Sequence, residues 1–228
     1  ACPELGSKRE NDLAHSIWSR KRKAYADQRI NVVAPSQWIA TEAMRSALFS
    51  GQPITLIPNG VDTILFRPRE RSAVRRSLGL PADSLIVLAG AHFLQDERKG
   101  FSYLIEALTR VHLDNEVLLL LVGEGDAKAL DQLLLPVHSL GYVQDNEILA
   151  CAYAASDICV IPSIFENLPN MALEALSCGT PVVGFNHGGL SDVVLHGQTG
   201  LLALWKDVSD LAEQISYLLE HVEIRKRM

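Results

Sequence analysis

The sequence predicts an α/β protein whose parallel sheet is covered by helices on both faces. Three observations support this fold class. Short apolar runs of strand length alternate with longer stretches of helical pattern, as expected for repeated strand-helix-strand units. The runs are continuously apolar rather than alternating, which is typical of strands buried on both faces. Residues that start and stop helices separate the stretches, with Asp145 before one helix and Gly179 after another.

Taken in order, the apolar runs predict strands at residues 30–34, 54–57, 85–89, 117–122, 158–161 and 182–185. The stretches between them predict helices at residues 11–28, 36–50, 101–110, 145–155, 171–178 and 208–221. Asp145 is the expected N-cap of its helix, and Glu147 in the first turn favours the positive end of the helix dipole. Asp145 and Glu147 also resemble a D-x-[DE] metal motif, but the N-cap accounts for them, so we expect no metal site.

A turn-rich break at Pro58-Asn59-Gly60 predicts a boundary between two parts of the chain. Residues 58–228 are enough for one doubly wound domain. Residues 1–57 contain too little sheet to stand alone, and we expect them to belong to a neighbouring domain or to pack as an extension. The chain ends inside a helical pattern, so we expect a fragment of a longer protein.

The composition excludes several classes of protein. Hydrophobic residues make up 48% and charged residues 21% of the 228, which excludes wholesale disorder and collagen-like repeats. The net charge of −6 makes general nucleic-acid binding a poor hypothesis. Residues 1–110 nevertheless carry 16 Lys and Arg against 11 Asp and Glu, whereas residues 111–228 carry 5 against 16. The basic half either binds anions or simply presents a solvated face.

Two further features bear on location. The four cysteines form no CxxC pair, so we expect buried free thiols in a reducing compartment, namely the cytoplasm. The basic run Arg20-Lys21-Arg22-Lys23 lies near aromatic side chains and either contacts anionic lipid at the inner face of the membrane or forms a solvated helix face.

Ligands of parallel α/β sheets bind at the carboxyl ends of the strands, which directs attention to the loop after residue 161. Glu166 lies in this loop, and Glu174 lies eight positions later, about one turn into the next helix. A carboxylate can accept two hydroxyl hydrogen bonds at once, which suits the vicinal diols of sugars and ribose. Amides near Asn170 and Met171 begin the helix and suit a phosphate. The alternative is a helix-start Glu followed by a solvent-facing helix Glu.

This segment, continued through residues 175–183 and 188–189, resembles the nucleotide-sugar-binding lobe of GT-B glycosyltransferases, more narrowly the retaining family 4, or glycosyl transferases group 1. The shared pattern is Glu-x7-Glu, then E-A-x-x-C-G-T-P-V-V, G-G-x-x-[ED] and G-x-L. Earlier matching segments are residues 57–62, 66–68, 98–100, 121–125 and 140–143. The resemblance covers nearly everything from residue 29 onward. It implies a Rossmann-like C-terminal lobe at residues 58–228, preceded at residues 1–57 by the end of the N-terminal acceptor lobe.

The resemblance also implies roles for individual residues. Glu174 would bind the ribose hydroxyls, and Glu166 the transferred sugar. Lys99 would pair with the diphosphate, although an ordinary surface lysine is the alternative. The remaining contacts would come from the backbone of Val143 to the base and from amides around Leu168, Asn170 and Met171 to the sugar and diphosphate.

The sequence departs from the family pattern at two places. Where many members have an Arg ahead of the Lys, this chain has Ala91-His92-Phe93, so that either Arg98 supplies the charge or His92 donates a hydrogen bond. Where many members read E-G-F-G, Pro169 removes one backbone donor, for which Asn167 or Asn170 can compensate.

The resemblance therefore implies a retaining, metal-independent glycosyltransferase, active in polysaccharide or glycoconjugate synthesis, that needs no cofactor. It would move a hexose from a UDP- or GDP-linked donor to a saccharide or lipid-linked acceptor. The alternatives are a GT-B-fold epimerase or phosphorylase, or a non-catalytic module that binds nucleotide sugars. The fragment alone is expected to bind nucleotide while lacking most of the acceptor lobe.

Overall fold

The structure is a computed structural model that describes residues 6–124, 130 and 133–228. The chain forms two compact units, Ala1–Pro58 and Asn59–Met228. The division falls inside the Pro58-Asn59-Gly60 break at which the sequence predicts a boundary.

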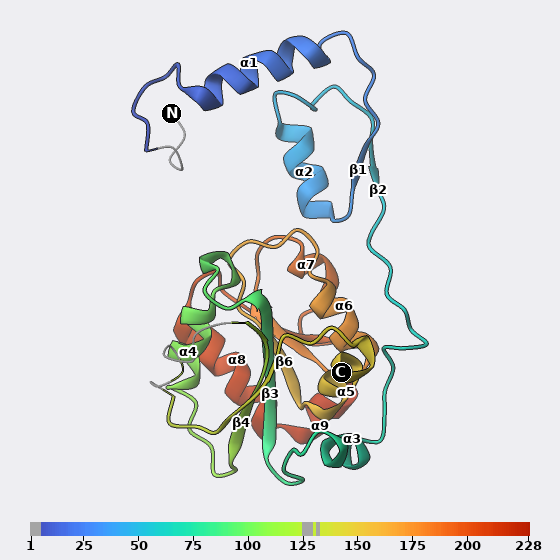
Figure 1. Cartoon of the computed structure of the whole chain (residues 1–228), viewed down its shortest axis with the longest axis vertical. Coiled ribbons are helices and arrows are strands. Elements are labelled where there is room, and N and C mark those ends of the chain that lie inside the picture. The colour runs from blue at the N-terminus through green and yellow to red at the C-terminus, as the bar shows by residue number, and fades with distance from the viewer. Residues whose placement is uncertain (1–5, 125–129, 131–132) are drawn as a thin grey trace. The chain divides into compact units, whose positions relative to one another are not determined.

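The first unit is a small α/β arrangement. It contains α1 (Leu13–Tyr25), β1 (Val32–Ala34), α2 (Gln37–Arg45) and β2 (Ile54–Leu56) (Figure 1). β1 and β2 run parallel, with Val32 opposite Ile54. Ser36 is the N-cap of α2: its side chain accepts from the Ile39 amide at 3.2 Å, and the helix buries Ala40. Both helices are shorter than the 11–28 and 36–50 stretches that the sequence pattern predicts.

The second unit is a doubly wound domain around a sheet of six strands in the order β5-β4-β3-β6-β7-β8. The pairings between these strands are all parallel, which confirms the predicted fold class. The strands are β3 (Leu85–Phe93), β4 (Val117–Glu124), β5 (Val137–Gly141), β6 (Ile158–Ile161), β7 (Val182–Phe185) and β8 (Gly200–Ala203). β3 and β6 are neighbours at the centre of the sheet. From β3 the chain adds β4 and β5 toward one edge, and from β6 it adds β7 and β8 toward the other edge, so the topological switch point lies between β3 and β6.

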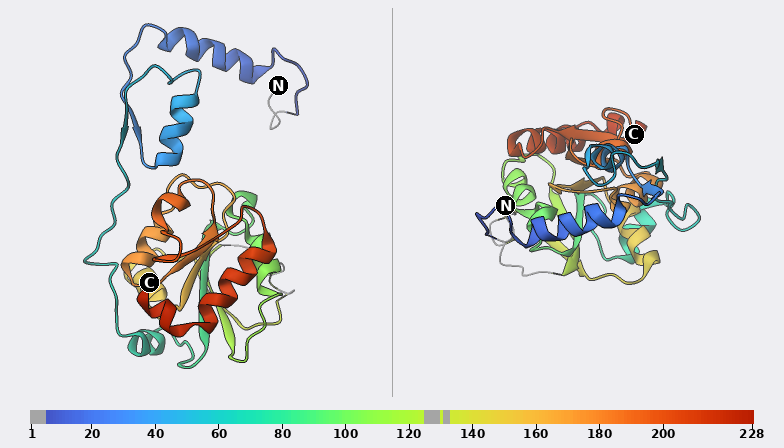
Figure 2. Two further views of the ribbon diagram at one scale, coloured as in Figure 1. Left: turned by 180° about the vertical axis from the view of Figure 1, so that it is seen from behind. Right: turned by 90° about the horizontal axis from the view of Figure 1, so that it is seen from above.

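Helices cover both faces of this sheet (Figures 1 and 2). They are α3 (Arg71–Ser77), η2 (Glu97–Lys99), α4 (Phe101–Leu108), α5 (Asn146–Ala155), α6 (Asn170–Ser177), α7 (Leu190–Val193), α8 (Val208–Glu220) and α9 (Val222–Arg227). On one face, Ile86 and Leu88 of β3 pack with α5 and α6. On the other, Val87 and Ala89 pack with α4 and α8. Successive residues of β3 thus enter different cores, which is why the strand is apolar throughout.

Among the described residues of this domain, five elements were not expected from the sequence pattern: α3, η2, β5, α7 and β8. β5 and β8 are the two edges of the sheet, and a strand at an edge needs no continuous apolar run. β5 accordingly contains His138 and Ser139 and has no fully buried residue. α3 contains three arginines, and it is held instead by the charged cluster described next.

A buried ion cluster fixes the amino end of β6. Asp157 is 3% exposed and accepts from Nη2 of Arg75 at 2.9 Å, from Nη1 of Arg71 at 2.9 Å and from Nη2 of Arg225 at 3.3 Å. Its carboxylate also accepts from the Ile86 amide at 2.8 Å. One carboxylate therefore ties α3, β3 and α9 to the start of β6, because a buried charge is stable only when it is paired and hydrogen-bonded.

Candidate nucleotide-sugar site

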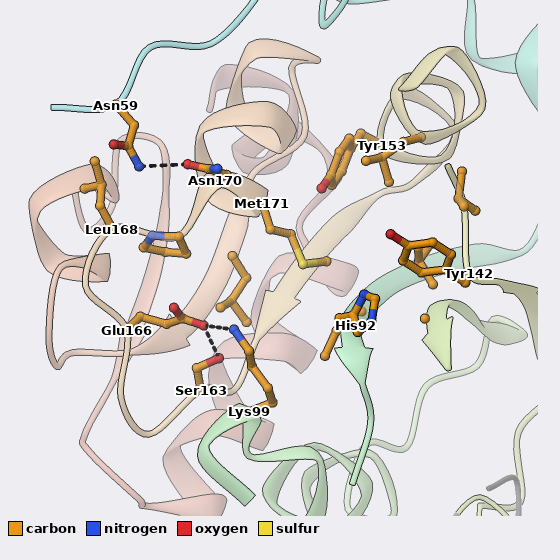
Figure 3. Close-up of a pocket in the computed structure, with 18 residues that line it drawn as sticks. Asn59, His92, Lys99, Tyr142, Tyr153, Ser163, Glu166, Leu168, Asn170 and Met171 are labelled. Atoms are coloured by element: carbon orange, nitrogen blue, oxygen red, sulfur yellow. Dashed lines mark hydrogen bonds and ion pairs between the residues drawn. The ribbon is translucent and has the colours of Figure 1, made fainter. Parts of the chain in front are cut away.

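A pocket of about 430 Å³ lies at the carboxyl ends of β3, β4, β5 and β6 (Figure 3). Its walls come from the last residues of these strands and the loops that follow them, from α5, from the first turn of α6 and from Asn59. It therefore occupies the switch point of the sheet, the place where open α/β sheets bind ligands. All residues that line it belong to the second unit.

Lys99 supplies a cation to this pocket. It closes the short helix η2, which begins at Asp96, whose side chain accepts from the Arg98 amide at 3.0 Å. The next residue is Gly100, at φ 67°, and a Cβ there would lie 1.9 Å from the carbonyl oxygen of Pro162. Only glycine allows this approach, which brings the loop after β3 against the loop after β6. The Ile164 amide donates to the Arg98 carbonyl at 2.9 Å and holds the two loops together.

Glu166 meets Lys99 across the junction of these loops. Nζ of Lys99 lies 2.5 Å from Oε1 of Glu166, and their side chains are 35% and 17% exposed. The Ser163 hydroxyl donates to the same oxygen at 3.0 Å (Figure 3). The Gly189 amide donates to the Glu166 carbonyl at 2.9 Å, and a Cβ on Gly188 would lie 2.4 Å from that carbonyl. The G-G pair therefore serves to support the backbone of Glu166.

The first turn of α6 forms another wall of the pocket. Leu168, Pro169, Asn170 and Met171 line the pocket here, and the first N–H groups of a helix have no partner within it. Nδ2 of Asn59 donates to Oδ1 of Asn170 at 2.9 Å (Figure 3). Asn59 also lines the pocket, although it lies 111 positions earlier in the chain. The arrangement offers amide donors beside the Lys99 cation, as an anionic ligand requires.

Glu174 lies next to the pocket, behind a tyrosine. It is half-buried on α6, and the hydroxyl of Tyr153 donates to its Oε2 at 2.8 Å. Tyr153 itself lines the pocket. Burial raises the pKa of the Glu174 carboxyl above its usual range, and the hydrogen bond from Tyr153 opposes this shift by favouring the ionised form.

The opposite end of the pocket is aromatic and apolar. The His92 ring lies 4.7 Å from the Tyr142 ring in an edge-to-face arrangement (Figure 3). Their chain neighbours Ala91 and Val143 also line the pocket, as does Leu149. Flat aromatic and apolar walls suit a planar group such as a nucleobase.

Of the predicted site residues, the structure brings six to the pocket: Lys99, Val143, Glu166, Leu168, Asn170 and Met171. Three others do not line it: Glu174, Asn167 and Arg98. Asn167 is exposed in the loop after β6. Arg98 pairs with Asp96 at 2.7 Å, and its side chain is 73% exposed. Of the two residues considered as replacements for the family's Arg, His92 therefore lies in the pocket and Arg98 does not.

Four lining residues with polar side chains were not predicted as ligand-binding residues: Asn59, Tyr142, Tyr153 and Ser163. Asn59 and Tyr142 lie within segments that carry the family resemblance, so position in a motif was an available signal. Tyr153 lies in an alanine-rich helix and gives no comparable signal, because its role depends on a contact with Glu174, 21 positions later.

Other sequence predictions concern features outside the pocket. Cys159 and Cys178 are buried free thiols and Cys151 is half-buried, whereas Cys2 lies outside the described residues. Asp145 caps α5 as expected, accepting from the Glu147 amide at 2.8 Å. In the part of the chain that the structure describes, no three His, Cys, Asp or Glu side chains group together as a metal site requires. No helix among the described residues is long and apolar enough to cross a membrane.

Comparison with known proteins extends these observations. The model of the family "Glycosyl transferases group 1" matches residues 83–221. The chain is 33% identical over 238 residues to a D-inositol 3-phosphate glycosyltransferase of Actinosynnema mirum, covering 89% of this chain and 56% of that protein. It is 28% identical over 240 residues to an MMP alpha-(1->4)-mannosyltransferase of Mycolicibacterium hassiacum, covering 96% and 56%. The chain thus spans little more than half the length of these relatives.

Solved structures show the same fold. A sucrose-phosphate synthase from Thermosynechococcus elongatus superposes with a TM-score of 0.79 at 31% identity, covering 97% of this chain and 56% of that one. HepE from Anabaena, in complex with UDP-glucose, superposes with a TM-score of 0.74 at 25% identity, covering 95% and 63%. Family model, relatives and fold agree, and the chain belongs to the glycosyl transferases group 1 family, with the fold of a GT-B glycosyltransferase lobe.

Proposed function

We propose that this chain is the donor-binding part of a retaining, metal-independent glycosyltransferase of family 4. The whole protein would move a hexose from a UDP- or GDP-linked donor to a saccharide or lipid-linked acceptor, in polysaccharide or glycoconjugate synthesis. The observation that carries the proposal is the pocket at the switch point, in which Lys99, Glu166 and the start of α6 meet. The complex of HepE with UDP-glucose, at 25% identity, supports this class of donor.

Each wall of the pocket suits one part of a nucleotide sugar. Lys99 and the first N–H groups of α6 would bind the diphosphate, because both present positive charge. Glu166 would accept from hydroxyls of the sugar, and Glu174 from those of the ribose. The end formed by His92, Tyr142 and Val143 would hold the base.

The same groups account for the chemistry without a divalent metal. Negative charge grows on the leaving diphosphate as the glycosidic bond breaks. A fixed cation and preorganised amides stabilise that charge in the transition state more than in the bound donor. Glu166 would hold the sugar in its reactive orientation. It is close enough to Lys99 to place the sugar beside the diphosphate that leaves it.

The first unit is proposed to be the end of an acceptor lobe, continued by residues outside this sequence. Its helix α1 carries the basic run at residues 20–23, buries none of its residues and places Arg22 over the Trp18 ring at 5.3 Å. We propose that this basic helix contacts anionic lipid at the cytoplasmic face of a membrane, where a lipid-linked acceptor would be found.

The test of the proposed function uses the whole protein with UDP-glucose and, in parallel, GDP-mannose, in the presence of EDTA. Release of nucleoside diphosphate is measured, and NMR identifies the first-formed anomer of the released sugar. We expect release of diphosphate from one donor, with the anomeric configuration of the donor retained. Binding without turnover would favour the non-catalytic module, and the opposite anomer would refute retention.

A further inference from the structure

Tyr153 is a buried tyrosine that nevertheless reaches the pocket. It is 2% exposed, yet it is one of the residues that line the site. Its ring packs edge-on against Phe66, with centroids 6.1 Å apart. The Thr180 hydroxyl donates to its carbonyl at 2.7 Å and fixes its backbone to the segment after α6. Both ring and backbone are therefore held, and the hydroxyl has a defined position.

The hydroxyl of this tyrosine donates to Oε2 of Glu174 at 2.8 Å. A glutamate side chain has several rotatable bonds, and ordering it costs conformational entropy. A donor on a rigid ring selects one of its orientations and occupies one of its two oxygens. Oε1 is then the oxygen left to accept from a ligand. Figure 3 shows Tyr153 on the side of the pocket next to Met171 of α6, the helix that carries Glu174.

We propose that Tyr153 is a positioning residue for the nucleotide: it holds Glu174 through Oε2 so that Oε1 meets the ribose hydroxyls. This inference rests on the proposed function and deepens it, because it assigns the orientation of the ribose to a residue on another helix. A merely structural tyrosine would need only its ring, which phenylalanine also provides. The hydroxyl itself is what the inference concerns.

The charge of Glu174 supports the arrangement. A hydroxyl donor favours the ionised carboxylate, and burial opposes ionisation. The titratable groups that face Glu174 are Tyr153 from α5, Cys159 from β6 and Cys178, the residue that caps the end of α6. Burial raises the pKa of both thiols, so they remain uncharged near neutral pH. The hydroxyl of Tyr153 is thus the group among these that lowers the pKa of Glu174.

The experiment compares the Tyr153→Phe variant with the unmodified chain by calorimetry, using UDP, GDP and inorganic pyrophosphate. We expect the variant to bind the nucleoside diphosphate ~5-fold more weakly, the loss of about one hydrogen bond. Pyrophosphate has no ribose, so its affinity is expected to stay unchanged. In a Glu174→Ala background, Tyr153→Phe is expected to have no further effect on nucleotide affinity, because the side chain that the hydroxyl holds is absent.

Two controls separate positioning from packing. Tyr103→Phe removes a hydroxyl from a tyrosine of α4 that packs on Phe185 outside the pocket, and it should leave all three affinities unchanged. The pH dependence gives the second readout. Without the hydroxyl the pKa of Glu174 rises further. As the pH is lowered, nucleotide affinity should therefore begin to fall at a higher pH in Tyr153→Phe than in the unmodified chain. Ionisation of the ligand is common to both proteins and cancels in the comparison.

The outcomes distinguish the inference from the function on which it rests. If the unmodified chain binds neither UDP nor GDP, the proposed function fails and the inference with it. If it binds one of them and Tyr153→Phe binds it equally well, only the inference is refuted. Equal losses for nucleotide and pyrophosphate, or an undiminished loss in the Glu174→Ala background, would also overturn it.

Discussion

Replacing Glu166 by glutamine should strengthen the binding of UDP or GDP. In the free protein, Oε1 of Glu166 lies 2.5 Å from Nζ of Lys99 and partly neutralises it. In the proposed complex, a bound diphosphate would compete for the same cation. Glutamine keeps the size of the side chain, and its carbonyl oxygen can still accept from Ser163, but it carries no charge. The variant therefore leaves Lys99 in place with its charge available to the diphosphate.

The exposure of the pair sets the size of the effect. At a protein dielectric of about 20, an ion pair at this separation is worth several kcal/mol. Solvent screens it here, because the Lys99 side chain is 35% exposed and the Glu166 side chain 17%. Measured values for such pairs extend to about 1 kcal/mol. The dissociation constant of the nucleoside diphosphate should accordingly fall ~5-fold.

The nucleotide sugar should respond in the opposite direction. It gains the same contact with Lys99 but loses hydroxyl hydrogen bonds to a carboxylate, worth about 1.5–3 kcal/mol for a charged acceptor. Calorimetric titration of both ligands into both proteins gives four affinities. The ratio of sugar-nucleotide to diphosphate affinity is expected to drop at least ~10-fold in Glu166→Gln.

A matched control removes the same charge elsewhere. The control is Glu97→Gln, because Glu97 lies on the same short helix as Lys99 but does not line the pocket. It should change neither affinity by more than the small effect of net charge. If Glu166→Gln leaves diphosphate affinity unchanged or weakens it, Lys99 does not pair with the diphosphate as proposed, and the assignment of the two residues is refuted.

Three other substitutions probe separate parts of the account. Glu174→Gln should weaken the binding of every ribose-containing ligand ~10-fold near neutral pH. Calorimetry at falling pH should show the higher affinity of the unmodified chain disappearing as the pH drops through the raised pKa of Glu174. A difference in affinity that stays constant with pH would contradict the role of the Glu174 charge. Asn59→Ala should weaken nucleotide-sugar binding ~5-fold without lowering the melting temperature, because it removes the hydrogen bond that orients Asn170; unchanged affinity would make that bond irrelevant to the ligand. Asp157→Ala should lower the free energy of unfolding by about 3–5 kcal/mol, because it leaves buried arginines unpaired. A melting temperature within a few degrees of that of the unmodified chain would refute the stabilising role of this cluster.

The central strands were predictable because burial on both faces demands a continuous apolar run. β3, β4, β6 and β7 each contain a predicted strand, although β3 and β4 extend beyond it to the rim of the pocket. The edge strand β5 escaped prediction, because one open side relaxes that demand and the strand contains His138 and Ser139. β8 is also an edge strand, but it is apolar and three of its four residues are buried, so this reason does not apply to it. Short polar helices such as α3 depend on partners far along the chain, namely Asp157 for Arg71 and Arg75.

In the site, too, individual residues were predictable from the sequence, whereas the contacts between them were not. Glu166 and Lys99 were predictable from local motifs, since each follows a strand that ends at the same edge of the sheet. The ion pair between them was not predictable, because Lys99 and Glu166 are 67 positions apart in the chain. Their contact depends on the close approach of two loops that Gly100 permits. The contact of Tyr153 with Glu174 likewise joins two helices and leaves no pattern along the chain.

The most direct test of the central claim is a calorimetric titration of the 228-residue chain with UDP-glucose, UDP, GDP-mannose and GDP in excess EDTA. We predict that one sugar nucleotide and its diphosphate bind with unchanged affinity when EDTA is replaced by magnesium, since Lys99 and the start of α6 supply the positive charge. In Lys99→Ala, the affinity for the diphosphate should fall far more than that for the free nucleoside. Binding that disappears on chelation, or a chain that binds none of the four ligands, would contradict the account.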